Sequence, residues 1–285
     1  YPVFEVVVQD DCSTDGTVEI VQEYQMKDKR IKLYINSQPL GFNYNFSTAF
    51  QKATGDFIAS SDQDDIWRKD KIEILIKKAE DHALLFHNSY LFTSSIQETA
   101  GLKNASNIIY NELYLLLKPF VPGHECFFSR RILAQYEQIV STEHSISYDS
   151  LLLLVGVTSG NISFIDEGLV YWRRHQAATS YNSAHQYTAW QGMMQAIKSL
   201  KSTSKRQIAQ RYFTAISHLP FHLQSSAKVT KLMKEGTILS ILQTCLICMT
   251  KRNLLYPHCG FFHSCLRSFF TPLYFLRDCT NFVIH

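Results

Sequence analysis

Residues 56–67, DFIASSDQDDIW, combine a short apolar run with a dense group of carboxylates. The apolar run predicts a buried strand, and Asp62, Asp64 and Asp65 follow it directly. In an α/β sheet the carboxyl end of a strand faces the crevice in which ligands bind. Three carboxylates this close repel one another unless a cation or a donor neutralises them, and oxygen ligands suit Mg²⁺ or Mn²⁺. An acidic turn that caps the next helix, for which Asp65 alone would suffice, is the other interpretation.

A second acidic pair lies near the start of the chain. Residues 3–8, VFEVVV, have the β-branched and aromatic character of an inner strand, and Asp10 and Asp11 follow at its carboxyl end. A capped turn before a helix explains the short polar side chains of residues 13–15, STD. It does not explain the two adjacent carboxylates before them. A carboxylate in that position can accept hydrogen bonds from a base or a ribose.

Three segments in this order resemble the family 2 glycosyltransferases, the inverting enzymes of the GT-A fold. They are residues 7–17 (VVQDDCSTDGT), 41–46 (GFNYNF) and 55–67 (GDFIASSDQDDIW). Residues 123–128 and 148–175 extend the likeness, so that it covers roughly residues 1–182. The motifs look very like the rhamnosyltransferase-like branch, which builds bacterial polysaccharides. Either acidic motif alone would be a weak signal, whereas the two at this spacing are a specific one.

The resemblance implies a GT-A-type α/β fold, a three-layer sandwich with a mostly parallel central sheet and a helical C-terminal extension. The alternation of strand-like and helix-like stretches in the first half agrees with that expectation, as does the helical periodicity of residues 69–80. We expect a catalytic domain over residues 1–182 and a helical, basic extension over residues 183–285. Family members normally begin with a further strand and helix, so we expect the catalytic domain to be N-terminally incomplete.

Residues 147–150, SYDS, contain the candidate base. They precede four leucines that predict the start of a buried helix, and an Asp in the first turn of a helix is by default a cap. In the family, an Asp or a His-Asp pair at the corresponding place acts as base. The resemblance therefore implies that Asp149 removes the proton of the acceptor hydroxyl.

Residues 171–175, YWRRH, resemble the Tyr-Arg-x-His motif with which relatives close over the donor diphosphate. Arg173, Arg174 and His175 are therefore candidate phosphate contacts, since a guanidinium suits oxyanions. His175 could instead ligate the metal or cap a helix. The two arginines could also form a solvated surface.

Composition agrees with a soluble α/β enzyme of 285 residues, of which 46% are hydrophobic. The net charge of +3 conceals an asymmetry, because residues 1–150 carry 14 basic and 21 acidic side chains and residues 151–285 carry 14 and 4. An acidic half can hold cations, and a basic half attracts anions. Seven cysteines, an odd number, indicate reduced thiols and a cytoplasmic location.

The last hundred residues are basic and contain many aromatic side chains. This composition suits the surface of an anionic membrane, such as the inner face of the plasma membrane, or packing against the catalytic domain. The apolar run 238–249 is shorter than the roughly 20 residues that span a bilayer. No nucleic-acid motif is present. Cys245, Cys248, Cys259 and Cys265 could suggest zinc, but their apolar setting and spacing favour thiols that pack between helices.

Together with these observations, the resemblance implies an inverting, metal-dependent hexosyl or deoxyhexosyl transferase. Its donor would be a UDP- or dTDP-sugar and its acceptor a glycan or lipid-linked glycan of the cell surface, as in capsule, O-antigen or cell-wall synthesis. The metal would be Mn²⁺ or Mg²⁺. The predicted donor contacts are Asp10, Asp11, Ser13, Asp62, Arg173, Arg174 and His175, and the predicted metal ligands are Asp64, Asp62 and His175. A nucleotidyltransferase of similar fold and a catalytically inactive, membrane-associated relative remain the alternatives.

Overall fold

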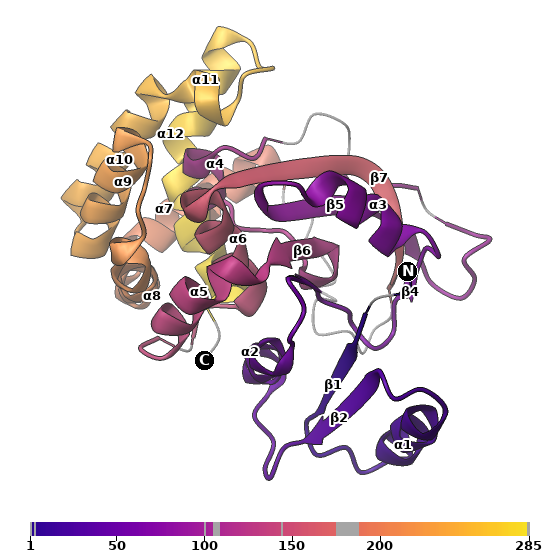
Figure 1. Cartoon of the computed structure of the whole chain (residues 1–285). Helices are drawn as coiled ribbons and strands as arrows, with labels where there is room; N and C mark the ends of the chain where they lie inside the picture. The colour runs from indigo at the N-terminus through magenta and orange to yellow at the C-terminus, as the bar shows by residue number, and fades with distance from the viewer. Residues whose placement is uncertain are drawn as a thin grey trace.

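A curled five-stranded sheet forms the centre of the protein (Figure 1). The computed structural model describes residues 2, 4–99, 101–104, 109–143, 145–174 and 188–283. Two long strands, β5 (His82–Phe92) and β7 (Asn161–Arg173), pair in parallel along their length. The strand order is β3-β6-β5-β7-β4, and the shorter strands are β3 (Phe57–Ala59), β4 (Ile66–Trp67) and β6 (Cys126–Ser129).

The sheet is mixed, which corrects the expectation of a mostly parallel one. Strand β6 runs antiparallel to both β3 and β5, and β4 runs antiparallel to β7. The expectation assumed that a helix returns the chain to the same end of the sheet before every strand. Strand β6 instead enters between β3 and β5 from the opposite end, after a short 3-10 turn (Gly123–Glu125). The α/β class and the helical C-terminal region are confirmed.

Helices cover both faces of the sheet, as a three-layer arrangement requires. Side chains alternate between the faces of a strand, so Leu84 and Leu85 enter different cores. Leu85 packs with Leu75 of α3 (Lys71–Ala79). Leu84 belongs to the larger core together with the leucines of α6 (Tyr148–Ser159). The predicted three layers are therefore confirmed.

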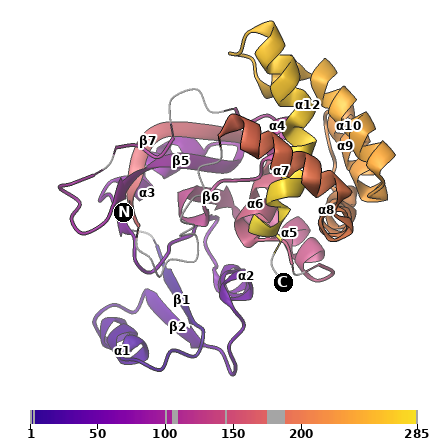
Figure 2. The same ribbon diagram turned by 180° about the vertical axis from the view of Figure 1, so that it is seen from behind.

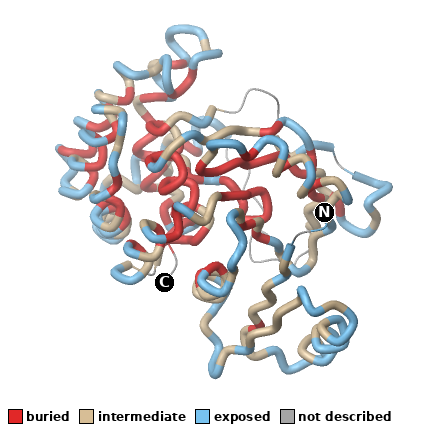
Figure 3. Tube along the Cα trace, in the orientation of Figure 1, coloured by how far each residue is buried: buried red, intermediate tan, exposed pale blue. Residues whose placement is uncertain are grey.

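Residues 4–52 form a smaller unit, drawn at the bottom of Figure 1, which packs against the main core through Phe50 of its last helix. Its two parallel strands are β1 (Val6–Asp10) and β2 (Ile31–Ile35), and its helices are α1 (Thr17–Lys27) and α2 (Phe42–Lys52). We expected β1 to be an inner strand. Within the described residues it instead pairs with β2 alone, in a two-stranded sheet, and Val6 is 40% exposed. Figure 3 shows that few residues of this unit are buried.

Glu5 connects this unit to the chain that leads into β3. Its carboxylate accepts hydrogen bonds from Lys32 Nζ (2.5 Å) and from Thr54 N and Oγ1 (2.5 and 2.7 Å). Burial would raise the pKa of Glu5, but these partners lower it to about 2. Because the unfolded chain takes up this proton near pH 4.5, the stabilisation is present above that pH and is lost as the pH falls towards 2.

We therefore expect Glu5→Gln to lower the free energy of unfolding at pH 7 by about 1–2 kcal/mol, since Lys32 is partly exposed and screened by solvent. Urea unfolding at pH 7 and near pH 2 measures the difference between parent and variant. The difference should disappear near pH 2. An equal difference at both values would contradict the assignment.

The C-terminal region is helical. Its helices are α7 (Ala189–Lys201), α8 (Thr203–Ala215), α9 (Gln224–Glu235), α10 (Ile238–Thr250), α11 (Arg252–Leu255) and α12 (Phe261–Asp278). Two further helices, α4 (Glu112–Leu117) and α5 (Leu133–Val140), lie between them and the sheet. All of these helices share one continuous core with α6. The boundary expected near residue 182 lies outside the described residues.

Cysteines contribute to this core. Cys245 and Cys248 of α10 are fully buried, which confirms the prediction that they pack between helices. All seven cysteines are described, and none forms a disulfide. None of the helices among the described residues has both the length and the apolar character needed to cross a bilayer.

Candidate functional site

The acidic loop, residues 60–65, connects β3 to β4 and lies against the end of β7. Strand β4 pairs with β7, which brings Arg173 to the loop. Arg173 donates its backbone amide to Asp65 Oδ1 and its Nε to the carbonyl oxygen of Asp64, each at 2.9 Å. Arg173, predicted as a phosphate contact, therefore lies beside the carboxylates, and its contacts within the protein are with the acidic loop itself.

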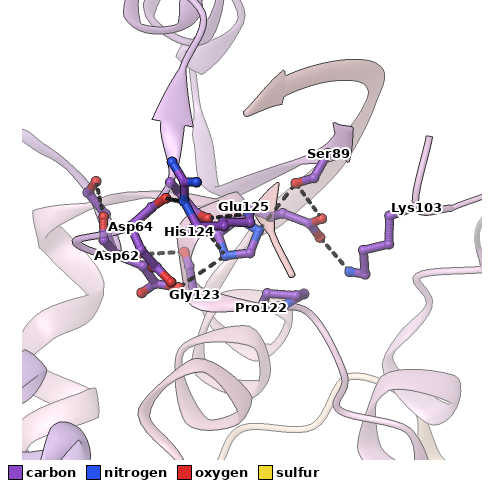
Figure 4. A network of polar contacts seen from close by, with 12 residues as sticks. Asp62, Asp64, Ser89, Lys103, Pro122, Gly123, His124 and Glu125 are labelled. Carbon is purple, nitrogen blue, oxygen red and sulfur yellow. Dashed lines mark hydrogen bonds and ion pairs between the residues drawn. The ribbon is translucent and has the colours of Figure 1, made fainter. Parts of the chain in front are cut away.

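Asp62, Asp65 and His124 converge at this loop. Nδ1 of His124 lies 3.3 Å from Oδ2 of Asp62 and 3.3 Å from Oδ2 of Asp65. Within the described part of the chain, these three are the group whose donor atoms all lie within 4.8 Å of one another, as metal ligands do. His124 and Asp65 are buried, whereas the side chain of Asp62 is 30% exposed. Figure 4 shows His124 between the acidic loop and a second polar cluster.

Asp65 fits a cation site. Burial raises its pKa to about 6, although His124 and the amide of Arg173 oppose the shift. Its Oδ2 is buried and accepts no hydrogen bond from the residues that the structure describes. Such an orphaned carboxylate oxygen is costly unless a cation or proton neutralises it. A pair of carboxylate oxygens with one imidazole nitrogen suits Mn²⁺.

The far side of His124 is held by the buried Ser89 and Glu125 and by the partly buried Lys103. Ser89 Oγ donates to Glu125 Oε1 at 2.8 Å and lies 3.2 Å from His124 Nε2, while Lys103 Nζ binds Glu125 Oε2 at 2.9 Å. Because the Ser89 hydroxyl gives its single proton to Glu125, His124 Nε2 must be the donor in its contact with Ser89. A neutral His124 then directs the lone pair of Nδ1 towards Asp62 and Asp65. Fixing a histidine tautomer in this way is typical of metal sites.

Lys71 lies beneath the same site and is completely buried. Its Nζ donates to the carbonyl oxygen of His124 at 2.9 Å and lies 3.8 Å from the centre of the Trp67 ring. Burial lowers its pKa to about 7, and the carboxylates of Asp65 and Glu125 are among the groups that oppose the shift. Lys71 thus fixes the backbone of the turn that presents His124.

Gly123 and Tyr148 bring the His124 turn next to the predicted base. A Cβ on Gly123 would lie 1.9 Å from Tyr148 Oη, so only glycine fits there. The carbonyl oxygen of Gly123 accepts from Ser60 Oγ at 2.6 Å. Asp149 follows Tyr148 in the first turn of α6 and is half-buried. Burial raises the pKa of Asp149, and the charge of Asp62 adds to the shift.

We therefore expect Gly123→Ala to destabilise the protein by about 1–3 kcal/mol, because the new methyl overlaps the buried Tyr148 ring. Thermal unfolding measures the loss. Gly16→Ala is the matched control, since nothing lies within 4 Å of its added Cβ and its φ is −75°. Equal melting temperatures for Gly123→Ala and the parent would contradict this close packing.

Asp10, Asp11 and Ser13 lie at the carboxyl end of β1, as predicted. Asp11 Oδ1 accepts from Leu40 N at 2.7 Å and Oδ2 from Gly41 N at 2.8 Å, so Asp11 holds the loop that enters α2. Burial would raise the pKa of Asp11, but these amides lower it. Asp10 Oδ2 accepts from Ser13 N at 3.0 Å. All three residues therefore stabilise the loop that follows β1, which we call the β1 loop.

Helix α2 links the β1 loop to the base. Asn43 Nδ2 donates to Ile146 O at 2.8 Å and its Oδ1 accepts from Tyr148 N at 2.6 Å. The start of α2, where Asp11 binds, therefore abuts the start of α6, where Asp149 lies.

Three predicted site residues remain: Arg174, His175 and Asp64. Arg174 stacks on Trp172, with its guanidinium 4.4 Å from the ring centre, and Trp172 lies 4.9 Å from the His124 ring. His175 lies outside the described residues. Asp64 is adjacent, but its carboxylate is not part of the three-ligand group. The role of His124 was missed, because the local pattern around it, GHE, does not show which residues it contacts in the fold.

The curled sheet and the helical C-terminal region are those of a GT-A-type protein. Residues 1–136 match the family model Glycosyl transferase family 2. The family resemblance that the sequence predicts is confirmed over this segment. The rhamnosyltransferase-like branch stays a prediction.

Two curated relatives agree with that match. The putative teichuronic acid biosynthesis glycosyltransferase TuaG of Bacillus subtilis is 40% identical over 73 residues, 26% of this chain and 29% of that protein. The UDP-Glc:alpha-D-GlcNAc-diphosphoundecaprenol beta-1,3-glucosyltransferase WfgD of Escherichia coli is 33% identical over 114 residues, 40% of this chain and 44% of that protein. The alignments thus span less than half the length of these relatives.

Solved structures extend the similarity of fold to nearly the whole chain. S. aureus TarS 1-349 in complex with UDP-GlcNAc superposes with a TM-score of 0.51 and 16% identity, over 94% of this chain and 81% of that one. Mannosyltransferase PcManGT from Pyrobaculum calidifontis, in complex with GDP-Man and Mn²⁺, superposes with a TM-score of 0.50 and 16% identity. The superposition covers 97% of this chain and 76% of that one. At these identities the similarity concerns the fold.

Proposed function

We propose that the protein is an inverting glycosyltransferase that moves a sugar from a nucleotide-sugar donor to a growing cell-surface glycan. The observation that carries the proposal is the convergence of Asp62, Asp65 and His124, from two separate segments, on one group of possible metal ligands. The family 2 match and the glycosyl-transfer activities printed for the relatives support it.

Asp149 is the proposed base. It removes the proton of the acceptor hydroxyl as that oxygen attacks the anomeric carbon of the donor, and the nucleoside diphosphate leaves from the opposite face. The raised pKa of Asp149 suits this task, because a stronger base accepts the proton more readily. The amide of Ser150, 2.7 Å from Asp149 Oδ1, fixes the orientation of the carboxylate.

Asp62, Asp65 and His124 are the proposed ligands of a divalent cation, Mn²⁺ or Mg²⁺. When bound, such a cation neutralises charge on the departing diphosphate. The orphaned Oδ2 of Asp65 and the lone pair of His124 Nδ1 support this ligand set, and a GT-A-type neighbour binds Mn²⁺. Asp64 and His175, predicted from sequence, stay candidate ligands.

The donor is proposed to be a UDP- or dTDP-sugar, a class to which the UDP-Glc of WfgD and the UDP-GlcNAc of TarS belong. Asp10, Asp11 and Ser13 would border the base and ribose, and Asp62 the ribose. Arg173, Arg174 and His175 would attend the diphosphate. The acceptor is proposed to be a lipid-linked glycan, by analogy with the diphosphoundecaprenol acceptor of WfgD. Seven thiols without a disulfide support a reducing, cytoplasmic location.

The experiment that tests this function is a screen of nucleotide sugars by thermal shift, with and without Mn²⁺, followed by an assay of nucleotide release. A ligand of the folded state raises the melting temperature. Stabilisation by a UDP- or dTDP-sugar together with release of UDP or dTDP supports the glycosyltransferase. Stabilisation by a nucleoside triphosphate with pyrophosphate release would instead indicate a nucleotidyltransferase. Donor binding without any turnover would indicate the inactive relative.

Ser89 provides a test of the His124 orientation. We expect Ser89→Ala to lower the Mn²⁺ affinity by about 10-fold or more, because removing a hydrogen-bond partner of a ligating histidine commonly costs that much. Calorimetric titration measures the affinity, and ¹⁵N chemical shifts of His124 report its tautomer. The exposed Ser94→Ala is the control. An unchanged tautomer and affinity in Ser89→Ala would contradict the proposed role.

A further inference from the structure

A groove runs along α12. Its volume is about 920 Å³, and it lies between α12, the start of α7 and the segment that follows α4. Figure 2 shows α7 lying across α12. On α12, the lining residues His263, Arg267, Tyr274 and Asp278 recur at helical spacing and so form one face. They span about 22 Å at 1.5 Å per residue.

Two cations in this groove approach the same aromatic ring. Lys118 Nζ lies 5.1 Å and the Arg267 guanidinium carbon 4.9 Å from the centre of the Tyr256 ring. Within the described residues, neither cation forms an ion pair with a carboxylate. The described carboxylate lining the groove is that of Asp278, which Arg277 already binds through two hydrogen bonds of 2.7 Å. The groove therefore carries positive charge that no lining side chain balances.

The chemistry of these cations favours a phosphate group. Stacking on Tyr256 and a hydrogen bond from Nη1 to Cys259 Sγ at 3.6 Å fix the guanidinium of Arg267. Its remaining N–H donors suit an oxyanion. Lys118 adds a second charge, and two like charges near one ring repel each other unless an anion lies between them. Apolar side chains, among them Leu117, Phe120 and Leu266, line the same groove. The combination suits an amphiphilic ligand with a phosphate or diphosphate.

Contacts connect this groove to the proposed base. Ser150 Oγ, next to Asp149, donates to the carbonyl oxygen of Pro119 at 2.9 Å, and Pro119 precedes the groove residue Phe120. Ser147 N donates to the carbonyl oxygen of Phe282, another groove residue, at 2.9 Å. The inner end of the groove therefore adjoins the start of α6. A ligand lying along α12 would direct one end towards the reacting centre.

We propose that this groove binds the acceptor through its diphosphate, with Lys118 and Arg267 as the anion contacts and the acceptor sugar directed towards Asp149. The inference rests on the proposed function, because it assigns the binding site of that reaction's second substrate. It makes the helical region part of the substrate site. The ligand class is a diphosphate that links a sugar to an apolar chain.

The test separates this groove from the donor site by removing the metal. Calorimetry in EDTA measures binding of geranyl diphosphate to the parent, to Lys118→Ala/Arg267→Ala and to the control Lys228→Ala. Lys228 is an exposed cation of α9 outside the groove. We expect the double variant to bind at least about 10-fold more weakly, as loss of two charge-assisted contacts implies, and the control to bind within about twofold of the parent. Binding of UDP with Mn²⁺ should be the same in all three.

Three results would overturn the inference: a parent that does not bind geranyl diphosphate in EDTA, a double variant that binds as the parent does, and a control that loses as much affinity as the double variant. Sedimentation with phosphatidylglycerol vesicles forms a second arm. Loss of vesicle binding in the double variant, with geranyl diphosphate binding unchanged, would assign the two cations to a bilayer surface. That result would also overturn the inference. A protein that binds the diphosphate but transfers no sugar refutes the proposed function while the groove assignment stands.

Discussion

Asp149→Asn is expected to lower kcat for sugar transfer by about 10²- to 10⁴-fold, the range that a general base contributes. The amide keeps the size of the carboxylate and can still accept the hydrogen bond from Ser150 N. Affinity for the nucleotide sugar should change little, because Asp149 acts on the acceptor. Initial rates of nucleotide release at saturating donor measure kcat, and calorimetry measures donor affinity.

Asp81→Asn is the matched control for this substitution, since Asp81 is exposed and lies away from the site. It should keep the parent's rate. The melting temperature of Asp149→Asn should stay close to that of the parent or rise, because burial already disfavours the charged carboxylate. A variant that folds and retains more than about a tenth of the parent's kcat would remove Asp149 from the role of base.

Asp62→Ala and Asp65→Asn are expected to weaken Mn²⁺ binding by about 100-fold or more, since even a hydrogen-bond partner of a metal ligand contributes 10- to 100-fold. Loss of Asp62 removes the exposed ligand through which an ion enters, and loss of Asp65 removes the buried one. Calorimetric titration with Mn²⁺ measures each affinity, and nucleotide release should fall in parallel. Treating the parent with EDTA should abolish release, and adding Mn²⁺ should restore it.

Asp64→Ala distinguishes the two ligand assignments. If Asp64→Ala loses more Mn²⁺ affinity than Asp65→Asn, the ligand role passes from Asp65 to Asp64, as the sequence predicts. If the parent binds no divalent cation at all, a doubly protonated His124 bridging Asp62 and Asp65 would explain the geometry instead. In that case the metal-dependent mechanism fails.

The sequence predicted most of the elements that position the site. The apolar runs before Asp10 and Asp62 were strands, and the periodicity of residues 69–80 gave α3, because burial on one side imposes those patterns. Arg173, predicted as a phosphate contact, lies at the acidic loop, and its role towards a phosphate stays a prediction. The motif showed where the carboxylates lie along the chain.

The direction of β6 and the role of His124 could not be read from local pattern. An antiparallel and a parallel strand have the same alternation of side chains, so only tertiary pairing decides between them. His124 reaches the acidic loop because Gly123 packs against Tyr148, a contact between residues 25 positions apart. The burial of Lys71 in the first turn of α3 is likewise a tertiary effect. Its burial depends on Trp67 and the carbonyl oxygen of His124.

The continuous core between α6 and the C-terminal helices has a practical consequence for anyone dissecting this protein. Tyr212, Phe213 and Phe275 belong to the same buried cluster as Leu151 and Leu152. A shortened version that keeps only the sheet would expose those leucines to water, at a cost of roughly 1.5–3 kcal/mol for each side chain. Activity measurements on this protein therefore require the sheet region and the C-terminal helices in one chain, because the two share a single hydrophobic core.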